Sequence, residues 1–121
     1  MVNKRVLVVD DSPTDRQALS NLLQREGYEV TTAVDGEDAL LKIAADPPPL
    51  IVLDIILPKM NGYQVLRQLR SDRGTRHIKV ILVSSKNQDS DRFWGMKQGA
   101  DEYIAKPYRD DDLLAAVARQ L

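Results

Sequence analysis

Short apolar runs alternate along the chain with longer segments in which apolar residues recur every three or four positions. A short run that is apolar throughout is typical of a strand buried on both faces of a parallel sheet, and the longer periodicity is typical of an amphipathic helix. The pattern predicts five strands, at residues 5–9, 28–33, 50–54, 80–83 and 103–105. Because strands and helices alternate throughout, we expect one parallel sheet with helices on both faces.

Capping residues and glycines mark five predicted helices. These helices are expected to begin near Pro13, Asp35, Tyr63, Ser90 or Asp91, and Asp110. The residues expected to face the core are Leu19, Leu22 and Leu23 in the first helix, Ala39, Leu40, Ile43 and Ala44 in the second, Val65, Leu66 and Leu69 in the third, Phe93, Met96 and Ala100 in the fourth, and Leu113, Leu114, Val117 and Leu121 in the fifth.

Length and composition limit the possible functions. The chain has 121 residues, enough for a single domain, which we place at residues 1–121. Its net charge of −1 argues against a nucleic-acid partner, and the absence of cysteine excludes disulfides and thiolate metal sites. The single histidine, His77, argues against a multi-histidine metal site. No apolar run is long enough to span a membrane, so we expect a cytoplasmic protein without DNA binding or membrane insertion.

Most of the predicted strands end in polar residues that are capable of chemistry. Asp10 and Asp11 follow the first strand, Asp54 ends the third, and Ser84 and Lys106 follow the fourth and fifth. Each has an ordinary interpretation as a cap, a turn residue or a solvated charge. The carboxyl ends of parallel strands lie along one edge of a sheet, where such folds bind ligands, so together these residues predict a site.

The residue types at this edge favour phosphoryl transfer. Three carboxylates held close together repel one another, and a hard divalent cation such as Mg²⁺ relieves that repulsion. A carboxylate beside Mg²⁺ and a lysine is suited to accept a phosphoryl group, because the metal and the ammonium offset charge on the transferring oxygens. The hydroxyl of Ser84 can bond one of those oxygens.

These motifs resemble the receiver domains of two-component response regulators, and the chain is similar to the stand-alone, CheY-like chemotaxis type. The matching segments are Val8-Val9-Asp10-Asp11, Asp54 with Pro58 and Asn61-Gly62, Val83-Ser84-Ser85, and Tyr103-Ile104-Ala105-Lys106-Pro107. The resemblance covers the whole chain. It implies a flavodoxin-like, doubly wound α/β fold whose five-stranded parallel sheet has the order 2-1-3-4-5, with five helices.

The resemblance also implies roles for the acidic residues. Asp54 corresponds to the phosphoryl acceptor, and Asp10 and Asp11 to the acidic pair that holds Mg²⁺ together with Asp54 and the backbone carbonyl of Ile56. The phosphoryl donor would be a sensor histidine kinase or a phosphotransfer protein. The protein would act as a phosphoacceptor rather than an enzyme, with only self-catalysed transfer and slow autodephosphorylation.

Three further residues match the family's switch. Ser84 corresponds to the switch hydroxyl, Lys106 to the lysine that pairs with the phosphoryl group, and Tyr103 to an aromatic residue whose ring turns inward upon activation. The peptide bond between Lys106 and Pro107 is commonly cis in this family. The signal would reach a protein target through the face formed by the fourth helix, fifth strand and fifth helix, from a monomer or a weak phosphorylation-linked dimer.

A narrower resemblance concerns residues 84–100 and the loop at residues 71–79. Both are similar to receivers of the twitching-motility branch, which act with type IV pili. The chain departs from many relatives at Ile56, where they carry a polar residue or methionine. Isoleucine cannot orient a hydrolytic water by hydrogen bonding, so we expect Ile56, with Lys86 on the other side, to set the lifetime of the phosphoryl group.

Two other protein classes use similar residues. A haloacid-dehalogenase-like, Mg²⁺-dependent phosphohydrolase also has an aspartate at a strand end, but it requires a second aspartate two positions later, where this chain has Ile56. A flavodoxin holds the phosphate of its flavin in the first loop, and Asp10 and Asp11 would repel that phosphate there.

Two surface features allow either a partner contact or an ordinary surface role. The basic residues Arg67, Arg70, Arg73, Arg76 and Lys79 are interpreted as a solvated face. Trp94 lies off the predicted inner stripe of its helix, and we interpret it as a partly buried flanking residue, with docking as the second interpretation.

Overall fold

Five parallel strands form one sheet with the order β2-β1-β3-β4-β5, as the sequence predicts. The computed structural model describes residues 3–86 and 88–121. The strands are β1 (Arg5–Val9), β2 (Glu29–Ala33), β3 (Leu50–Asp54), β4 (Lys79–Ser84) and β5 (Glu102–Ala105). The direction of strand addition reverses between β1 and β3, which is where doubly wound folds form their ligand crevice.

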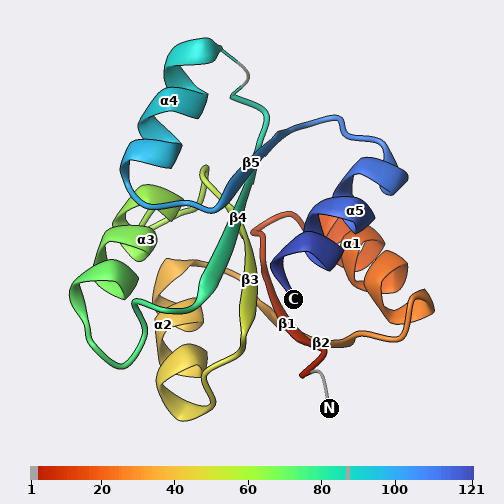
Figure 1. Ribbon diagram of the computed structural model, residues 1–121, viewed down its shortest axis with the longest axis horizontal. Helices are drawn as coiled ribbons and strands as arrows, with labels where there is room; N and C mark the ends of the chain where they lie inside the picture. Colours follow the sequence, from red (N-terminus) through yellow and green to blue (C-terminus); the bar gives the residue numbers. More distant parts are fainter. Residues whose placement is uncertain (1–2, 87) are drawn as a thin grey trace.

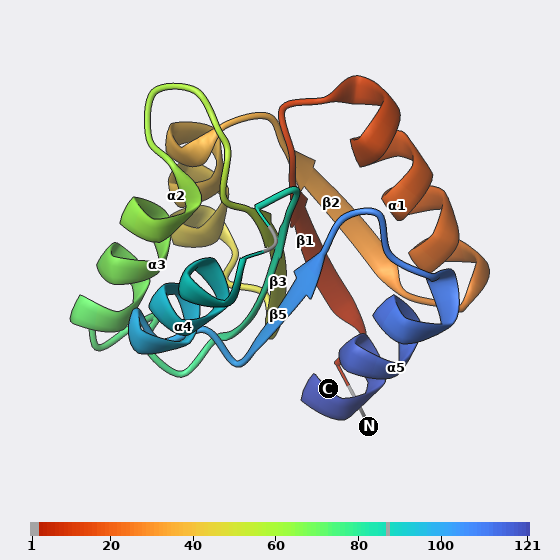
Figure 2. The same cartoon turned by 90° about the horizontal axis from the view of Figure 1, so that it is seen from above.

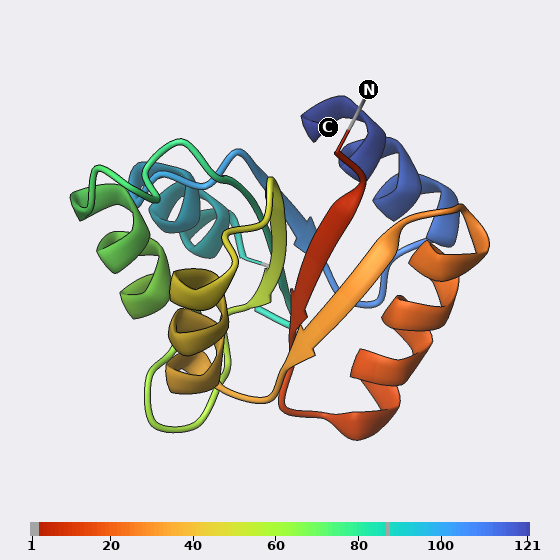
Figure 3. The same cartoon turned by 90° about the horizontal axis from the view of Figure 1, so that it is seen from below.

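Helices cover both faces of the sheet. They are α1 (Pro13–Arg25), α2 (Gly36–Ala45), α3 (Gly62–Ser71), α4 (Asp89–Lys97) and α5 (Asp110–Gln120). Helices α1 and α5 lie on one side, and α2, α3 and α4 lie on the other (Figures 1, 2 and 3). The structure therefore has the flavodoxin-like arrangement expected from the alternation of strands and helices.

The central strands are buried on both faces, which explains their uninterrupted apolar sequences. Successive residues of a strand point to opposite faces. Val52 accordingly belongs to the core beneath α1 and α5, whereas its neighbours Ile51 and Leu53 belong to the core beneath α2 and α3. A strand in this position has no solvent-facing side, so a polar residue is accommodated only at its end.

The predicted inner faces of the helices are confirmed for α1, α3 and α5. In α2 the prediction is wrong for Ala44, which is exposed. In α4 it is wrong for Phe93 and Met96, which are 65% and 43% exposed. Ala100 is buried as predicted, but it lies beyond the end of α4.

Helix α4 contacts the sheet through Gly95, the one buried residue of this helix. A Cβ atom at this position would lie 2.9 Å from the Leu82 side chain and 3.0 Å from the Tyr103 ring. The absence of a side chain therefore lets the helix approach the sheet closely along this line. Because Gly95 faces the sheet, Phe93 and Met96 face outward, although the apolar periodicity predicts that they face the core.

The interpretation of Arg70 as a solvated residue is also wrong, although Arg67, Arg73, Arg76 and Lys79 are exposed. The guanidinium of Arg70 donates to the carbonyls of Gly99, at 3.0 Å, and Ile78, at 2.7 Å. It also forms an ion pair with Asp101 at 3.1 Å. Arg70 thus joins α3 to the loops that precede β4 and β5.

The loop that follows β3 is held close to the strand end by Gly62, the first residue of α3. Its N–H donates to the carbonyl of Ile55 at 2.9 Å. A Cβ atom on Gly62 would lie 2.4 Å from the backbone oxygen of Asp54 and 2.8 Å from the Ile55 Cα. Backbone atoms cannot move aside as the end of a side chain can, so this glycine fixes the backbone at Asp54.

We predict that Gly62→Ala lowers the free energy of unfolding by about 2 kcal/mol or more, because a buried backbone contact must open. Alanine is the better helix former, so helix propensity alone predicts the opposite sign. Urea denaturation measures the difference. The control is Gly74→Ala, whose Cβ would meet only the Asp72 side chain at 3.5 Å. Equal unfolding midpoints for the two variants would contradict the close approach.

Candidate functional site

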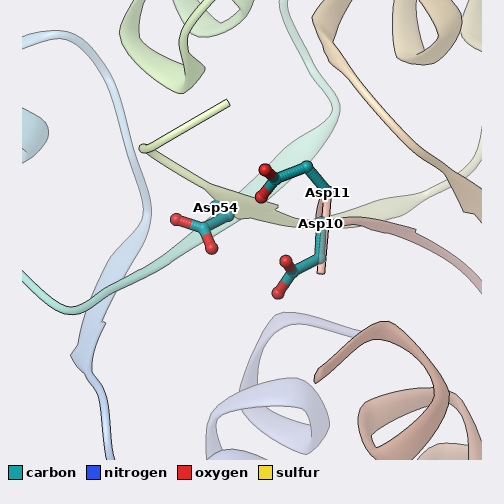
Figure 4. A group of neighbouring side chains, drawn as sticks. All are labelled: Asp10, Asp11 and Asp54. Atoms are coloured by element: carbon teal, nitrogen blue, oxygen red, sulfur yellow. The ribbon is translucent and has the colours of Figure 1, made fainter. Parts of the chain in front are cut away.

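Three carboxylates meet at the carboxyl ends of the neighbouring strands β1 and β3. Asp10 and Asp11 follow β1, and Asp54 is the last residue of β3. One carboxylate oxygen from each lies within 4.8 Å of the other two (Figure 4). Asp10 and Asp54 are 4% and 8% exposed, and Asp11 is exposed. The structure therefore brings together the three acidic residues that the sequence identifies.

Lys106 reaches this group from the end of β5. Its Nζ lies 2.9 Å from Oδ2 of Asp10 and 2.9 Å from Oδ2 of Asp54. The peptide bond between Lys106 and Pro107 is cis, as the resemblance predicts. Lys106 is separated from Asp10 by 96 positions in the sequence, so the alternating topology creates this contact.

Burial and the neighbouring charges have opposite effects on the pKa values of Asp54 and Lys106. Burial raises the pKa of the Asp54 carboxyl, and hydrogen bonds from Lys106 and from the Ile56 N–H reduce that rise. Burial also lowers the pKa of the Lys106 ammonium, but its hydrogen bonds with Asp54 and Asp10 outweigh burial and raise it above its usual value. The contacts with Asp54 and Asp10 therefore favour the charged form of Lys106.

Backbone hydrogen bonds orient both buried carboxylates. The N–H of Ser12 donates to Asp10 Oδ1 at 3.0 Å, and the N–H of Ile56 donates to Asp54 Oδ1 at 3.0 Å. Each carboxylate thus has one oxygen on a backbone donor and the other on Lys106. The Ile56 side chain is 50% exposed next to this loop. The carboxylates are therefore positioned before any ligand arrives.

Ser84 and Tyr103 are joined through the backbone of Lys86. Ser84 is fully buried, and its Oγ accepts a hydrogen bond from the Lys86 N–H at 3.2 Å. The hydroxyl of Tyr103 donates to the Lys86 carbonyl. Asp54 pairs with Val83 in the sheet, so Ser84 lies one residue beyond this pair on the neighbouring strand. These hydrogen bonds connect the end of β4, next to Asp54, with Tyr103 of β5.

Tyr103 is 5% exposed and belongs to the core beneath α2 and α3. Arg92 of α4 holds it there, since its guanidinium donates to the Tyr103 carbonyl at 3.1 Å and lies 5.4 Å from the ring centroid. Burial, with a contribution from Tyr63 and Asp91, raises the pKa of Tyr103 to about 12. The phenol therefore remains a hydrogen-bond donor at neutral pH.

Two residues of this region were not identified from the sequence. Asp15 lies 3.1 Å from Lys106 Nζ, and Arg92 contacts Tyr103. Asp15 is the third residue of α1, where an acidic residue is common for helix stability alone, so the sequence gives no signal of its contact with Lys106. Asp15 lines a cavity of about 370 Å³ together with Asp10 and Asp54, and this cavity extends to Leu19 and Val52.

Within residues 3–86 and 88–121, no helix is long and apolar enough to cross a membrane.

Comparison with known proteins identifies the family. The model of the response regulator receiver domain matches residues 6–118. The chain belongs to this family. The receiver is 39% identical over 113 residues to Protein PilH of Pseudomonas aeruginosa, covering 93% of each chain. It is equally identical to Protein PilG of the same organism, covering 93% of this chain and 84% of PilG.

Among solved structures, the receiver resembles the receiver domain of the sensor histidine kinase PA1611 from Pseudomonas aeruginosa. That structure has a magnesium ion coordinated in the active-site cleft. The TM-score is 0.89, the identity 26%, and the match covers 98% of both chains. The fold inferred from the sequence is thereby confirmed.

The family assignment settles the class of protein. Receivers are signalling proteins that histidine kinases or phosphotransfer proteins phosphorylate. The comparisons lend no support to the haloacid-dehalogenase alternative. The acidic group of Asp10, Asp11 and Asp54 is consistent with Mg²⁺ binding.

Proposed function

We propose that Asp54 accepts a phosphoryl group from a phosphohistidine donor and that the receiver then signals to a protein target. The observation that carries this proposal is the position of Lys106, whose Nζ is 2.9 Å from both Asp54 and Asp10. A buried carboxylate beside a fixed ammonium has a nucleophilic oxygen and a positive charge for the incoming phosphoryl oxygens.

The residues present fit Mg²⁺ as the cofactor. Three carboxylate oxygens within 4.8 Å of one another form the hard, oxygen-only donor set that Mg²⁺ prefers. We propose Asp10, Asp11, Asp54 and the backbone carbonyl of Ile56 as its ligands. The magnesium ion in the active-site cleft of the PA1611 receiver supports this proposal. When bound, the ion supplies positive charge that offsets the charge on the transferring phosphoryl oxygens.

The chain's own residues then carry out an in-line displacement. A carboxylate oxygen of Asp54 forms a bond with phosphorus while the bond from phosphorus to the donor imidazole nitrogen breaks, and the imidazole keeps the electron pair. Lys106 remains protonated and transfers its hydrogen bond from the Asp54 carboxylate to a phosphoryl oxygen. The hydroxyl of Ser84 donates to a second phosphoryl oxygen. Because the same hydroxyl accepts a hydrogen bond from the Lys86 N–H, this new bond affects the position of Lys86.

Incubation with acetyl phosphate and Mg²⁺ tests the acceptor. We expect one phosphoryl group per chain by intact mass, on Asp54 by peptide mapping. Asp54→Asn should stay unlabelled, because an amide oxygen is a poor nucleophile, and EDTA should abolish labelling of the parent. Labelling that persists in Asp54→Asn or in EDTA would overturn the assignment.

We further propose that the signal leaves through α4, β5 and α5. Phe93 and Trp94 on α4 are 65% and 49% exposed, so this face offers apolar surface to a protein partner. Hydrogen bonds join Ser84 through Lys86 to Tyr103, and Ser84 lies on the strand next to Asp54, which supports a path from Asp54 to this face. The homology to PilH and PilG supports a target in a pilus or chemotaxis pathway.

Beryllofluoride, a mimic of the phosphoryl group, tests this coupling. With Mg²⁺ it should change the emission of Trp94, the single tryptophan, because a new bond to Ser84 shifts the Lys86 backbone. Tyr103→Phe, which lacks the hydroxyl that contacts Lys86, should show a smaller change. An unchanged Trp94 emission in the parent, or an equal response in Tyr103→Phe, would exclude this path.

Ile56 and Lys86 are proposed to set the lifetime of phospho-Asp54. Hydrolysis needs a water in line with the bond from phosphorus to Asp54, and the half-exposed Ile56 side chain follows the acceptor by two positions. Isoleucine cannot hydrogen-bond that water, and its bulk shields the phosphorus. Lys86 follows Ser84 by two positions and can bind a phosphoryl oxygen from the other side.

Ile56→Asn should shorten the lifetime by about tenfold to a hundredfold, the usual effect of one positioning contact on a barrier. Mg²⁺ binding should be retained, because the proposed ligand is the backbone carbonyl. Decay of phosphoprotein would be followed beside Leu41→Asn, a control at an apolar residue that is 71% exposed on α2. If phosphorylated Ile56→Asn decays as slowly as the phosphorylated parent, Lys86 rather than Ile56 would set the lifetime.

A further inference from the structure

Three carboxylates hold the Lys106 ammonium. Its Nζ lies 2.9 Å from Asp10 Oδ2, 2.9 Å from Asp54 Oδ2 and 3.1 Å from Asp15 Oδ2. An ammonium group has three hydrogens. Each hydrogen therefore has one carboxylate acceptor, and the position of the nitrogen is fixed from three directions.

Asp15 differs from the other two partners. Asp10 and Asp54 belong to the group of three carboxylates within 4.8 Å of one another, and Asp15 does not. Asp15 comes from the first turn of α1, and its side chain is 52% exposed, against 6% for Asp10 and 10% for Asp54. Asp15 is therefore not among the residues proposed to bind Mg²⁺ or to accept the phosphoryl group.

We propose that Asp15 is a positioning residue for phosphoryl transfer, acting through Lys106. This inference rests on the function proposed above. When Asp10 and Asp54 are engaged by a cation and a phosphoryl group, their oxygens are shared with these ligands. Asp15 remains as a full anionic partner of Lys106 and keeps its Nζ next to the phosphoryl oxygens.

The negative charge of Asp15 could instead act directly, by repelling an anionic phosphoryl donor at the cleft. The two effects have opposite signs. If Asp15 positions Lys106, its neutralisation slows transfer, whereas if repulsion dominates, its neutralisation accelerates transfer. A rate measurement therefore separates them, and the expected size follows from a half-exposed ion pair of about 1 kcal/mol or less.

The experiment compares Asp15→Asn with the parent in labelling by acetyl phosphate at saturating Mg²⁺. We expect the variant to be about two- to fivefold slower, the rate equivalent of such an ion pair. The matched control is Asp111→Asn, which removes one exposed acidic residue from the first turn of α5. Its rate should equal that of the parent.

Two further measurements identify the route. In a Lys106→Met background, Asp15→Asn should cause no further loss, because the residue through which it acts is missing. In protein labelled with ¹⁵N-lysine, the Lys106 ammonium signal should be observable in the parent and should broaden in Asp15→Asn as its protons exchange faster with water. This second readout does not depend on the rate of labelling.

Unchanged or faster labelling of Asp15→Asn, an equal loss in the Lys106→Met background, or an unaltered ammonium signal would each overturn the inference. These outcomes differ from failure of the proposed function. If the parent itself is not labelled on Asp54, phosphoryl acceptance is wrong. If the parent is labelled and Asp15→Asn matches it, only the role of Asp15 is wrong.

Discussion

The arrangement at the carboxyl edge of the sheet depends on one ammonium group among buried carboxylates. Asp10 and Asp54 are almost inaccessible to solvent, and ionised carboxylates are costly to bury without a partner. Lys106 supplies that partner from the far end of the sheet, since β5 is separated from β3 by β4. The contact therefore joins the first, middle and last strands at the point where chemistry is proposed. Any change in the charge of Asp54 alters the electrostatic balance of this group.

The burial of the strands determines both the fold and the position of the site. The central strands are apolar because they are buried on both faces, so their charged residues are confined to the ends. The parallel arrangement then brings the carboxyl ends to the same edge. Gly62 and the N–H groups of Ser12 and Ile56 supply the finer positioning, by close backbone approach and by hydrogen bonds to carboxylate oxygens. Packing thus selects where charge is placed, and local backbone geometry selects how it is oriented.

The sequence predicts the sheet and the acidic group well because both follow from simple periodicity and from the ends of apolar runs. It fails where a residue's environment is created by distant segments. The inner face of α4 is set by the missing side chain of Gly95 rather than by its apolar residues, and Arg70 finds carbonyl acceptors in two loops. Asp15 resembles an ordinary residue of a helical first turn until Lys106 is placed beside it. Such contacts have no local signature.

The orientation of α4 has a consequence for local stability. Gly95 is the one buried residue of this helix, so α4 is held to the sheet by little apolar surface. Segments with few buried contacts open at a lower free energy than the global unfolding of the domain. We therefore expect α4 to open at a lower free energy than the sheet. A partner that covers Phe93 and Trp94 would stabilise the packed helix, so the proposed output surface would become more ordered on binding.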